Sequence, residues 1–200
     1  MAITINGTGS ITGLTAGGLP DASVTSDDIA AGAVTAAKIG YAGAILQVVQ
    51  TVKTDTNSHT GSTWGDTNLS ATITPSSANS KILVLVDAMI SSNVGYAMKI
   101  KLVRNATDVY IGDAATNQPR VSKVMHGTYS TGVDSSSASA SIIYLDSPAT
   151  TSSTTYKLQF GSYTPNTIYL NRTGNNGADA TNQFFDGRGA SSITLLEVAG

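Results

Sequence analysis

The residues that could do chemistry in this chain are few, and their spacing does not suit catalysis. The 200 residues contain no cysteine, two histidines, His59 and His126, and 13 acids, of which Glu197 is the single glutamate. The absence of cysteine excludes disulfides, thiolate metal sites and a cysteine nucleophile. Neither histidine has a second histidine at helical metal-ligand spacing. We therefore expect both histidines to be solvated loop side chains.

Hydrolase and nucleotide-binding signatures are also missing. The sequence has no Gly-x-Ser-x-Gly elbow, and residues 7–13 lack the glycine spacing of a dinucleotide-binding loop. A glycosidase needs two carboxyl groups roughly 5–10 Å apart across a cleft. Asp108 with Asp113, or Asp134 with Asp146, could form such a pair, but a protein of many strands always offers some. We predict no catalytic residue, no metal ligand and no cofactor, so the chain is not expected to be an enzyme.

The composition indicates an all-β protein. Serine and threonine supply 51 residues, whereas charged residues make up only 12%. Exposed helix faces are usually filled by Glu, Lys and Arg, so this scarcity argues against a helical bundle. The net charge of −2 gives no electrostatic reason to bind nucleic acid, and no apolar run is long enough for membrane insertion. Four Asn-x-Ser/Thr sequons follow from the abundance of these residue types, at Asn6, Asn68, Asn105 and Asn171.

The sequence changes character near residue 40. All twelve aromatic residues follow that point. Before it, apolar residues recur every five positions, a period that matches neither a strand nor a heptad. Such a segment has no core of its own and needs identical neighbours around an axis, which predicts a multi-chain stalk over residues 19–40. The alternative is a flexible linker. The predicted stalk core consists of Leu19, Val24, Ile29, Val34 and Ile39.

From Tyr41 onward the pattern is one of short strands separated by turn residues. About nine strands of this kind predict a β-sandwich or jelly roll over residues 41–200. The run Ile82–Val86 is apolar on both faces, as expected of a central strand. Two long loops are predicted at 113–138 and 171–191. The expected strands are Ala44–Lys53, Leu69–Thr74, Lys81–Ile90, Tyr96–Arg104, Thr107–Gly112, Ser139–Asp146, Thr154–Gly161, Thr167–Arg172 and Ser192–Ala199.

Several stretches resemble the fibre proteins of tailed bacteriophages, marine phages in particular. The first is Gly13-Leu14-Thr15-Ala16-Gly17-Gly18-Leu19-Pro20 with the following repeats Val24–Ile29 and Val34–Ile39, which resembles tail-fibre shafts. The others resemble distal fibre domains: Thr72-Ile73-Thr74-Pro75-Ser76-Ser77-Ala78-Asn79-Ser80-Lys81-Ile82-Leu83-Val84 and the ending from Ser191 to Gly200. The resemblance implies a homotrimer located in the virion, docked on other virion proteins through residues 1–18. It also implies a C-terminal β-rich domain that contacts the host surface.

The low charge and the abundance of hydroxyl groups suit a host glycan or outer-membrane component as the target. Aromatic side chains in loops add contact area at a low cost in entropy. The candidate receptor-binding residues are those in or beside the predicted loops: Tyr129, Tyr163, Arg172, Phe184 and Phe185.

Two other functions remain open from the sequence. The chain could be a capsid- or neck-attached decoration fibre with no receptor role, because such a protein also needs trimeric attachment and a polar outer domain. A glycan depolymerase is the third and least favoured alternative, since no carboxylate pair stands out.

Overall fold

The computed structural model describes residues 24, 27, 29–34, 38, 41–93, 97–126, 137–162, 166–174 and 186–200. The chain divides into two compact units, residues 1–40 and residues 41–200, which are described separately. The second unit is called the head below.

In its described part, the head consists of antiparallel strands without regular helix. The strands are β1 (Ile45–Lys53), β2 (Asn57–Thr60), β3 (Gly65–Ile73), β4 (Lys81–Ser92), β5 (Ala97–Arg104), β6 (Thr107–Val109), β7 (Lys123–His126), β8 (Ser137–Asp146), β9 (Thr154–Gly161), β10 (Thr167–Leu170) and β11 (Ser191–Val198).

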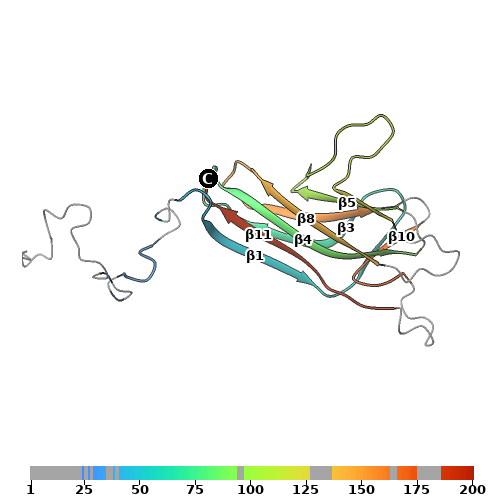
Figure 1. Ribbon diagram of the computed structural model, residues 1–200, viewed down its shortest axis with the longest axis horizontal. Helices are drawn as coiled ribbons and strands as arrows, with labels where there is room; N and C mark the ends of the chain where they lie inside the picture. The colour runs from blue at the N-terminus through green and yellow to red at the C-terminus, as the bar shows by residue number, and fades with distance from the viewer. Residues whose placement is uncertain are drawn as a thin grey trace, which may run out of the picture. The chain divides into compact units, whose positions relative to one another are not determined.

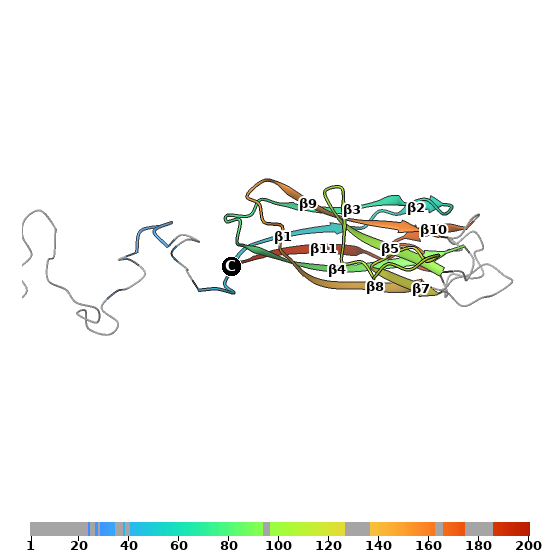
Figure 2. The ribbon, with the colours of Figure 1, turned by 90° about the horizontal axis from the view of Figure 1, so that it is seen from above.

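These strands form two sheets that pack as a sandwich. In sheet A, β1, β11, β4 and β8 lie side by side, as Figure 1 shows. Strand β10 pairs with the last residues of β4, beyond the end of β11, and β2 pairs with β10. In sheet B the order is β3, β9 and β5, and both β6 and β7 pair with the remaining edge of β5. Figure 2 shows the head from above.

Eight of the strands pair in a nested order that defines the topology. Leaving out the short strands β2, β6 and β10, the first strand pairs with the last, β1 with β11. Going inward along the chain, β3 pairs with β9, β4 with β8 and β5 with β7. A long antiparallel ribbon folded over on itself in this way is a jelly roll. The predicted all-β sandwich is therefore confirmed, and its topology is the second of the two expected forms.

Alternation along the strands sets which side chains form the core. In β9, Tyr156, Leu158 and Phe160 are fully buried, whereas Lys157 and Gln159 face outward. Strand β4 pairs along both edges, as the run Ile82–Val86 predicts, and every second residue of that run is buried. Burying a side chain of this size contributes about 1.5–3 kcal/mol. The largest fully buried residues are Tyr156, Phe160, Leu69, Ile73, Ile82, Ile90, Met98, Ile100, Leu102, Ile142, Leu158 and Ile168.

Two short strands do not follow from the sequence pattern. Strand β2 consists of Asn57, Ser58, His59 and Thr60, which carry no apolar alternation. It forms because β10 offers it a partner edge. Strand β7 lies inside the predicted loop 113–138 and pairs with the first half of β5. In both cases the segment becomes a strand because a neighbouring strand offers it backbone hydrogen bonds, and not because of its own sequence pattern.

A buried carboxylate joins the two sheets at one end of the sandwich. Asp146 ends β8 in sheet A and is 3% exposed. Its Oδ2 accepts hydrogen bonds from Arg104 Nη1 at 2.7 Å and from the Tyr156 hydroxyl at 2.6 Å, both from sheet B. Its Oδ1 accepts a third from the Tyr144 hydroxyl at 3.2 Å. Burial, together with the bond to Asp146, raises the pKa of Tyr156, so the phenol remains a donor.

The single glutamate anchors a connection between the sheets. Glu197 of β11 is fully buried. Its Oε1 accepts hydrogen bonds from the backbone N–H and the hydroxyl of Ser76, at 2.7 and 2.6 Å, and its Oε2 accepts one from Gln47 Nε2. Burial alone would raise the pKa of Glu197, but these hydrogen bonds outweigh it and hold the pKa below the ordinary value. The carboxylate therefore fixes the β3–β4 connection to sheet A.

In the first unit, three of the five predicted stalk residues are described. Val24, Ile29 and Val34 are 53%, 45% and 57% exposed, and a turn closes from the Ala33 N–H to the Ala30 carbonyl. Leu19 and Ile39 lie outside the described residues, as does the predicted attachment segment 1–18. The stalk stays a prediction. Among the described residues, no helix has the length and apolar character that crossing a membrane requires.

We expect the Asp146 cluster to contribute more to stability than any exposed ion pair of the head. Asp146→Ala leaves Arg104 and the buried Tyr156 hydroxyl without their acceptor, which should lower the free energy of unfolding by about 3–5 kcal/mol. Tyr156→Phe should cost about 1–3 kcal/mol. Urea denaturation measures both. The control is Lys157→Gln, which removes the exposed Lys157–Asp66 pair and should cost about 0–1 kcal/mol. Equal losses in all three variants would contradict the assignment.

Glu197 should make stability depend on acid in a defined direction. Because its folded pKa is lowered, it stabilises the fold above its unfolded pKa of about 4.3, and that contribution is lost as pH falls through the folded pKa. Glu197→Gln should therefore have a lower free energy of unfolding than wild type at pH 7. The difference in stability between the two proteins should become smaller below about pH 4. Thermal melts of both proteins from pH 7 to pH 3 measure this. A gap that stays constant over the whole range would contradict it.

Candidate functional site

The nested pairing gathers four connections at one end of the head. Strand ends meet there in register: Ser91 pairs with Ser137, Ala97 with His126. The β9 end and the β10 strand lie there too, since Gly161 pairs with Lys99 and Ile168 with Ser92. We call this the distal end. It receives the β1–β3, β4–β5, β7–β8 and β9–β11 connections.

The opposite, proximal end holds both ends of the head. The Gly43 N–H donates to the Ala199 carbonyl, and the Ala199 N–H donates to the Ala44 carbonyl, each at 2.8 Å. Tyr41 and Gly200 therefore flank the first and last strands at this end, next to the Asp146 and Glu197 clusters. Chain entry and the four distal connections are separated by the length of the sandwich.

Of the five candidate receptor-binding residues, Arg172 is the one that lies in the described part of the chain. It is half-buried and follows β10 at the distal end. Its guanidinium carbon lies 3.6 Å from the ring centroid of Tyr169, and its carbonyl accepts the Ser91 hydroxyl at 2.6 Å. A cation–π contact at a partly exposed site is worth about 0.5–1 kcal/mol, so Tyr169 orients the guanidinium without consuming its N–H donors.

The other four candidates lie outside the described residues: Tyr129, Tyr163, Phe184 and Phe185. Tyr129 belongs to the β7–β8 connection, Tyr163 to the β9–β10 connection, and the phenylalanines to the β10–β11 connection. The strands that flank these connections end at the distal end, and the role of the four aromatic residues stays a prediction.

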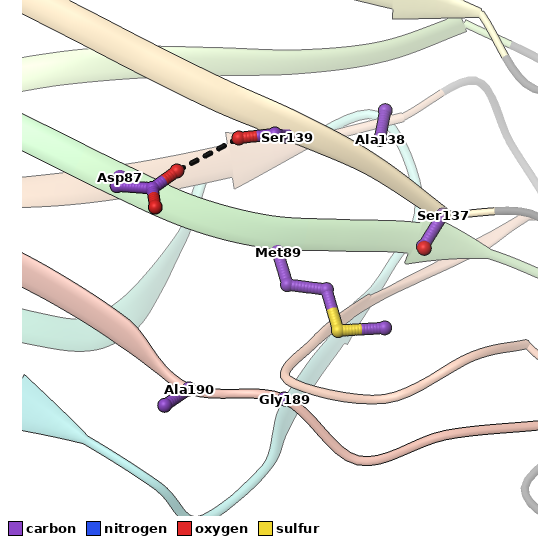
Figure 3. Close-up of a pocket in the computed structure, with 7 residues that line it drawn as sticks. All are labelled: Asp87, Met89, Ser137, Ala138, Ser139, Gly189 and Ala190. Carbon is purple, nitrogen blue, oxygen red and sulfur yellow. Dashed lines mark hydrogen bonds between the residues drawn. The ribbon is translucent and has the colours of Figure 1, made fainter.

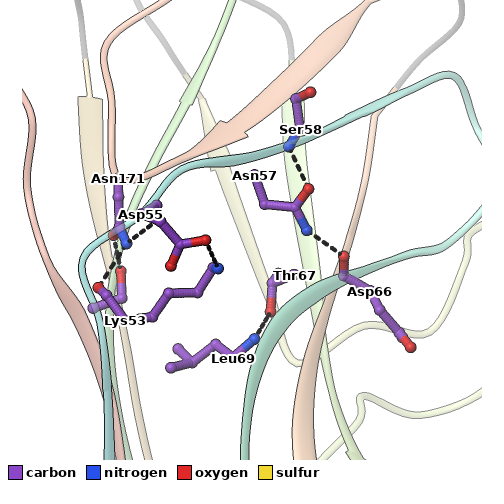
Figure 4. Close-up of polar contacts among 9 residues, drawn as sticks. Lys53, Asp55, Asn57, Ser58, Asp66, Thr67, Leu69 and Asn171 are labelled. Carbon is purple, nitrogen blue, oxygen red and sulfur yellow. Dashed lines mark hydrogen bonds and ion pairs between the residues drawn. The ribbon is translucent and has the colours of Figure 1, made fainter.

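A buried asparagine holds the backbone on which Arg172 sits (Figure 4). Asn171 is fully buried and has a φ of 60°, in the left-handed region that asparagine tolerates better than most residues. Its Nδ2 donates to the Lys53 carbonyl at 2.7 Å and to the Asp55 carbonyl at 3.0 Å. Its Oδ1 accepts the Ser191 hydroxyl. One side chain therefore joins β1, β10 and β11, and the sequon at Asn171 is enclosed in the folded head.

Two further contacts rigidify the first distal connection. The Asn57 Nδ2 donates to the Asp66 carbonyl at 2.8 Å, which ties β2 to β3. His59 stacks against Phe160, with ring centroids 6.1 Å apart, and its Nε2 lies 2.8 Å from the Thr63 carbonyl. The expectation that His59 is a solvated loop residue is wrong, because strand β2 places its ring against the core. His126 is exposed.

An open groove of about 300 Å³ lies on the outer face of sheet A (Figure 3). One of its lining residues, Gly189, follows Arg188, whose backbone pairs with that of Arg172. Asp87 of β4 points into it and accepts the Ser139 hydroxyl at 2.7 Å. Met89 lies across the groove toward Gly189, where an added Cβ would come within 2.4 Å of the Met89 sulfur. We call this the distal groove. It is lined by Asp87, Met89, Ser137, Ala138, Ser139, Gly189 and Ala190.

The residues that line the distal groove can exchange hydrogen bonds with a ligand. A carboxylate and two serine hydroxyls line the groove and offer both donors and acceptors, which suits a ligand rich in hydroxyl groups. Ser139 donates directly to Asp87, with no histidine between them to act as a base. The described residues contain no group of three or more metal-binding side chains. Asp108 pairs with Lys101 at 2.5 Å and Asp146 is held in its buried cluster, so neither lines this groove.

Sequence reasoning missed two parts of this site. Tyr169 could have been found from the alternation in Thr167–Leu170, where Ile168 and Leu170 face the core and Tyr169 faces outward. Asp87 is the single charged residue of β4 beyond Lys81, which is a signal of an exposed position on an otherwise apolar strand. The groove itself depends on the return of residues 187–190 to the edge of β4, which no local pattern encodes.

We predict that Asn171 is required to keep this end of the head folded. Asn171→Asp keeps the shape and the backbone conformation but removes both Nδ2 hydrogen bonds, so unfolding should become easier by about 2–4 kcal/mol. The control is Asn68→Asp, at an exposed position with a similar φ of 59°, where a loss of less than about 1 kcal/mol is expected. Guanidinium denaturation measures both. Comparable losses in the two variants would show that the amide contacts are not the cause.

Comparison with known proteins does not assign a family. No family model matches the chain, and no curated protein matches it. Among solved structures, the T=1 particles derived from infectious bursal virus give a TM-score of 0.36 at 13% identity, over 76% of this chain. The Gx strain of infectious bursal disease virus also gives 0.36, at 10% identity over 77% of this chain. The chain spans 36% and 37% of the length of those two proteins, and likeness at this level does not assign a function.

Proposed function

We propose that this protein is a homotrimeric virion fibre whose head attaches a tailed bacteriophage to a glycan on the host surface. The observation that carries the proposal is the separation of the two ends of the head. The chain enters beside Ala199 at the proximal end. The distal end holds the four connections, Arg172 and the distal groove. An adhesin needs this arrangement, since one end must be anchored while the other meets its target.

The resemblance of the sequence to phage fibres supports the viral setting. The exposed Val24, Ile29 and Val34 support the trimer, because recurring apolar residues that are exposed in a single chain favour association of identical chains. Residues 1–18 are proposed to dock on other virion proteins.

The chemistry of the distal end favours a glycan over a charged or apolar target. Asp87 and the serine hydroxyls of the groove accept and donate hydrogen bonds, and the Arg172 guanidinium presents a planar fork of donors. Sugar hydroxyls match this mixture. Tyr129, Tyr163, Phe184 and Phe185 are proposed to add aromatic contacts from the neighbouring connections.

The proposal is tested with the full-length chain, labelled with a fluorophore and applied to a panel of bacterial cells. Binding should be saturable and should be competed by surface polysaccharide extracted from the bound strain. Arg172→Ala should weaken binding by about tenfold or more, the size expected for losing a charged hydrogen-bonding group. Arg120→Ala is the matched control, because Arg120 is exposed between β6 and β7 of sheet B and bonds to the Gly112 carbonyl.

The alternatives give different results. If virions carry the chain but the isolated protein binds to none of their susceptible hosts, the protein is a decoration fibre. That result would overturn the receptor role. Release of reducing sugar from the extracted polysaccharide would instead indicate a depolymerase.

A further inference from the structure

The two sheets of the head differ sharply in what their outer faces carry. On sheet B, the outward residues of β5 and β9 include Lys99, Lys101 and Lys157, which is the usual wet face of an antiparallel sheet. On sheet A, one register row crosses all four main strands with aliphatic residues alone. That row is Val48, Leu196, Leu83 and Leu145.

A second row extends the apolar surface. Leu85 and Ile143 lie opposite each other in the next outward row, beside Thr194. Ile143 is 67% exposed, Val48 58% and Leu145 47%. We call this six-residue surface the proximal apolar face, comprising Val48, Leu83, Leu85, Ile143, Leu145 and Leu196. The three leucines between these exposed residues are half-buried. A contiguous apolar surface of this kind on a folded domain usually marks an interface with another protein.

The two apolar rows lie between rows that each contain one charged residue; on the proximal side Val198 pairs with the exposed Lys81. Val48 and Leu196 pair only a few residues from the Ala44–Ala199 contact at the proximal end. Toward the distal end the next outward row contains Val52, Ser192, Asp87 and Ser141, and the distal groove follows. The outer face of sheet A is thus divided into an apolar part near the entry point and a polar part near the candidate glycan site.

We propose that the proximal apolar face is covered by a second copy of this chain, so that the copies of the trimer are joined through the head as well as through the stalk. This inference rests on the homotrimer of the proposed function and adds the surface that makes it. Three observations favour a copy of the same chain over another partner.

The first observation is charge. The two rows of the face contain no charged residue, so identical copies can meet there without like charges being brought together. The face offers no aromatic platform and few hydrogen-bonding groups, so a glycan gains little from it.

The second observation is continuity along the chain. Val24, Ile29 and Val34 are exposed in the first unit, Tyr41 is 83% exposed, and Val48 follows within the first strand. Exposed apolar residues therefore continue in sequence from the predicted stalk onto the face.

The third observation is shape. An open hollow of about 330 Å³ lies between β4, β8 and β11. Its proximal part is bordered by Leu85, Ile143 and Thr194, and its distal part by Asp87, Ser141 and Ser192. The proximal part can receive aliphatic side chains from a neighbouring copy. Around a threefold axis, the β1 edge of one copy meets the β8 edge of the next, which brings Val48 of one chain toward Leu145 of another.

The absence of cysteine makes a direct test possible in the full-length protein. Val48→Cys and Leu145→Cys are introduced together. Within one chain these positions are three strand spacings apart, roughly 14 Å, which is too far for a disulfide. Mild oxidation at micromolar protein should therefore yield covalent dimers and trimers on a non-reducing gel. The control, Thr72→Cys with Val124→Cys, occupies the outer face of sheet B at the same strand separation and should stay monomeric on the gel.

A second measurement tests the energetic contribution. Val48→Lys should shift the dissociation of the assembly to at least tenfold higher protein concentration in light scattering, whereas Val124→Lys, at a site 48% exposed, should not. Both positions are exposed in the single chain, so both variants should keep the wild-type melting curve of the monomer.

The outcomes separate this inference from the proposed function. A wild-type mass of 20.4 kDa at all concentrations would overturn both the trimer and the proximal interface. A mass three times larger, with no cross-link through residues 48 and 145 and no effect of Val48→Lys, would overturn the interface alone. Cross-linking of this pair to a different virion polypeptide, and not between copies, would likewise overturn it.

Discussion

The nested antiparallel pairing of eight strands is the constraint on which the rest of the head depends. Because β1 pairs with β11 and each later strand pairs with the corresponding earlier one, every connection is assigned to one of two ends. The same pairing determines which residues share a register row on sheet A. The distal groove, the apolar face and the position of chain entry are therefore consequences of one topology rather than separate features.

Two buried carboxylates hold that topology in place at the proximal end. Asp146 joins sheet A to Arg104 and Tyr156 of sheet B, and Glu197 fixes the β3–β4 connection. At the distal end an uncharged residue, Asn171, joins three strands through the hydrogen bonds of its side chain. Acids are scarce in this chain, and two of those present are used to join elements of the core rather than to form a reactive site.

A strand could be predicted from the sequence where apolar and polar residues alternate along it. The range Thr154–Gly161 is the same in sequence and structure because Tyr156, Leu158 and Phe160 alternate with polar residues. Strand β2 was not predictable, since its residues are polar and its formation depends on β10. The sandwich follows from such patterns, whereas the nested pairing needs the long-range register that a single sequence does not display.

The candidate site was predictable in part for the same reason. Arg172 stands out as a charge beside a long loop, but Tyr169, which orients it, becomes visible only when β10 is placed in the sheet. The role of Asn171 depends on carbonyls of Lys53 and Asp55, more than a hundred residues away in sequence. Glu197 lies in the last expected strand, but its hydrogen bonds with Ser76, 121 residues away in sequence, depend on the folded β3–β4 connection.

The hydrogen bonds between residues 43–44 and Ala199 have a consequence for how this fold can be reused. A domain whose first and last strands end side by side can be inserted within a surface loop of an unrelated protein without stretching the host backbone. The head could therefore be inserted into another protein that offers two closely spaced attachment points. Exchanging the distal connections, which take no part in that junction, would leave the attachment points of the domain unchanged.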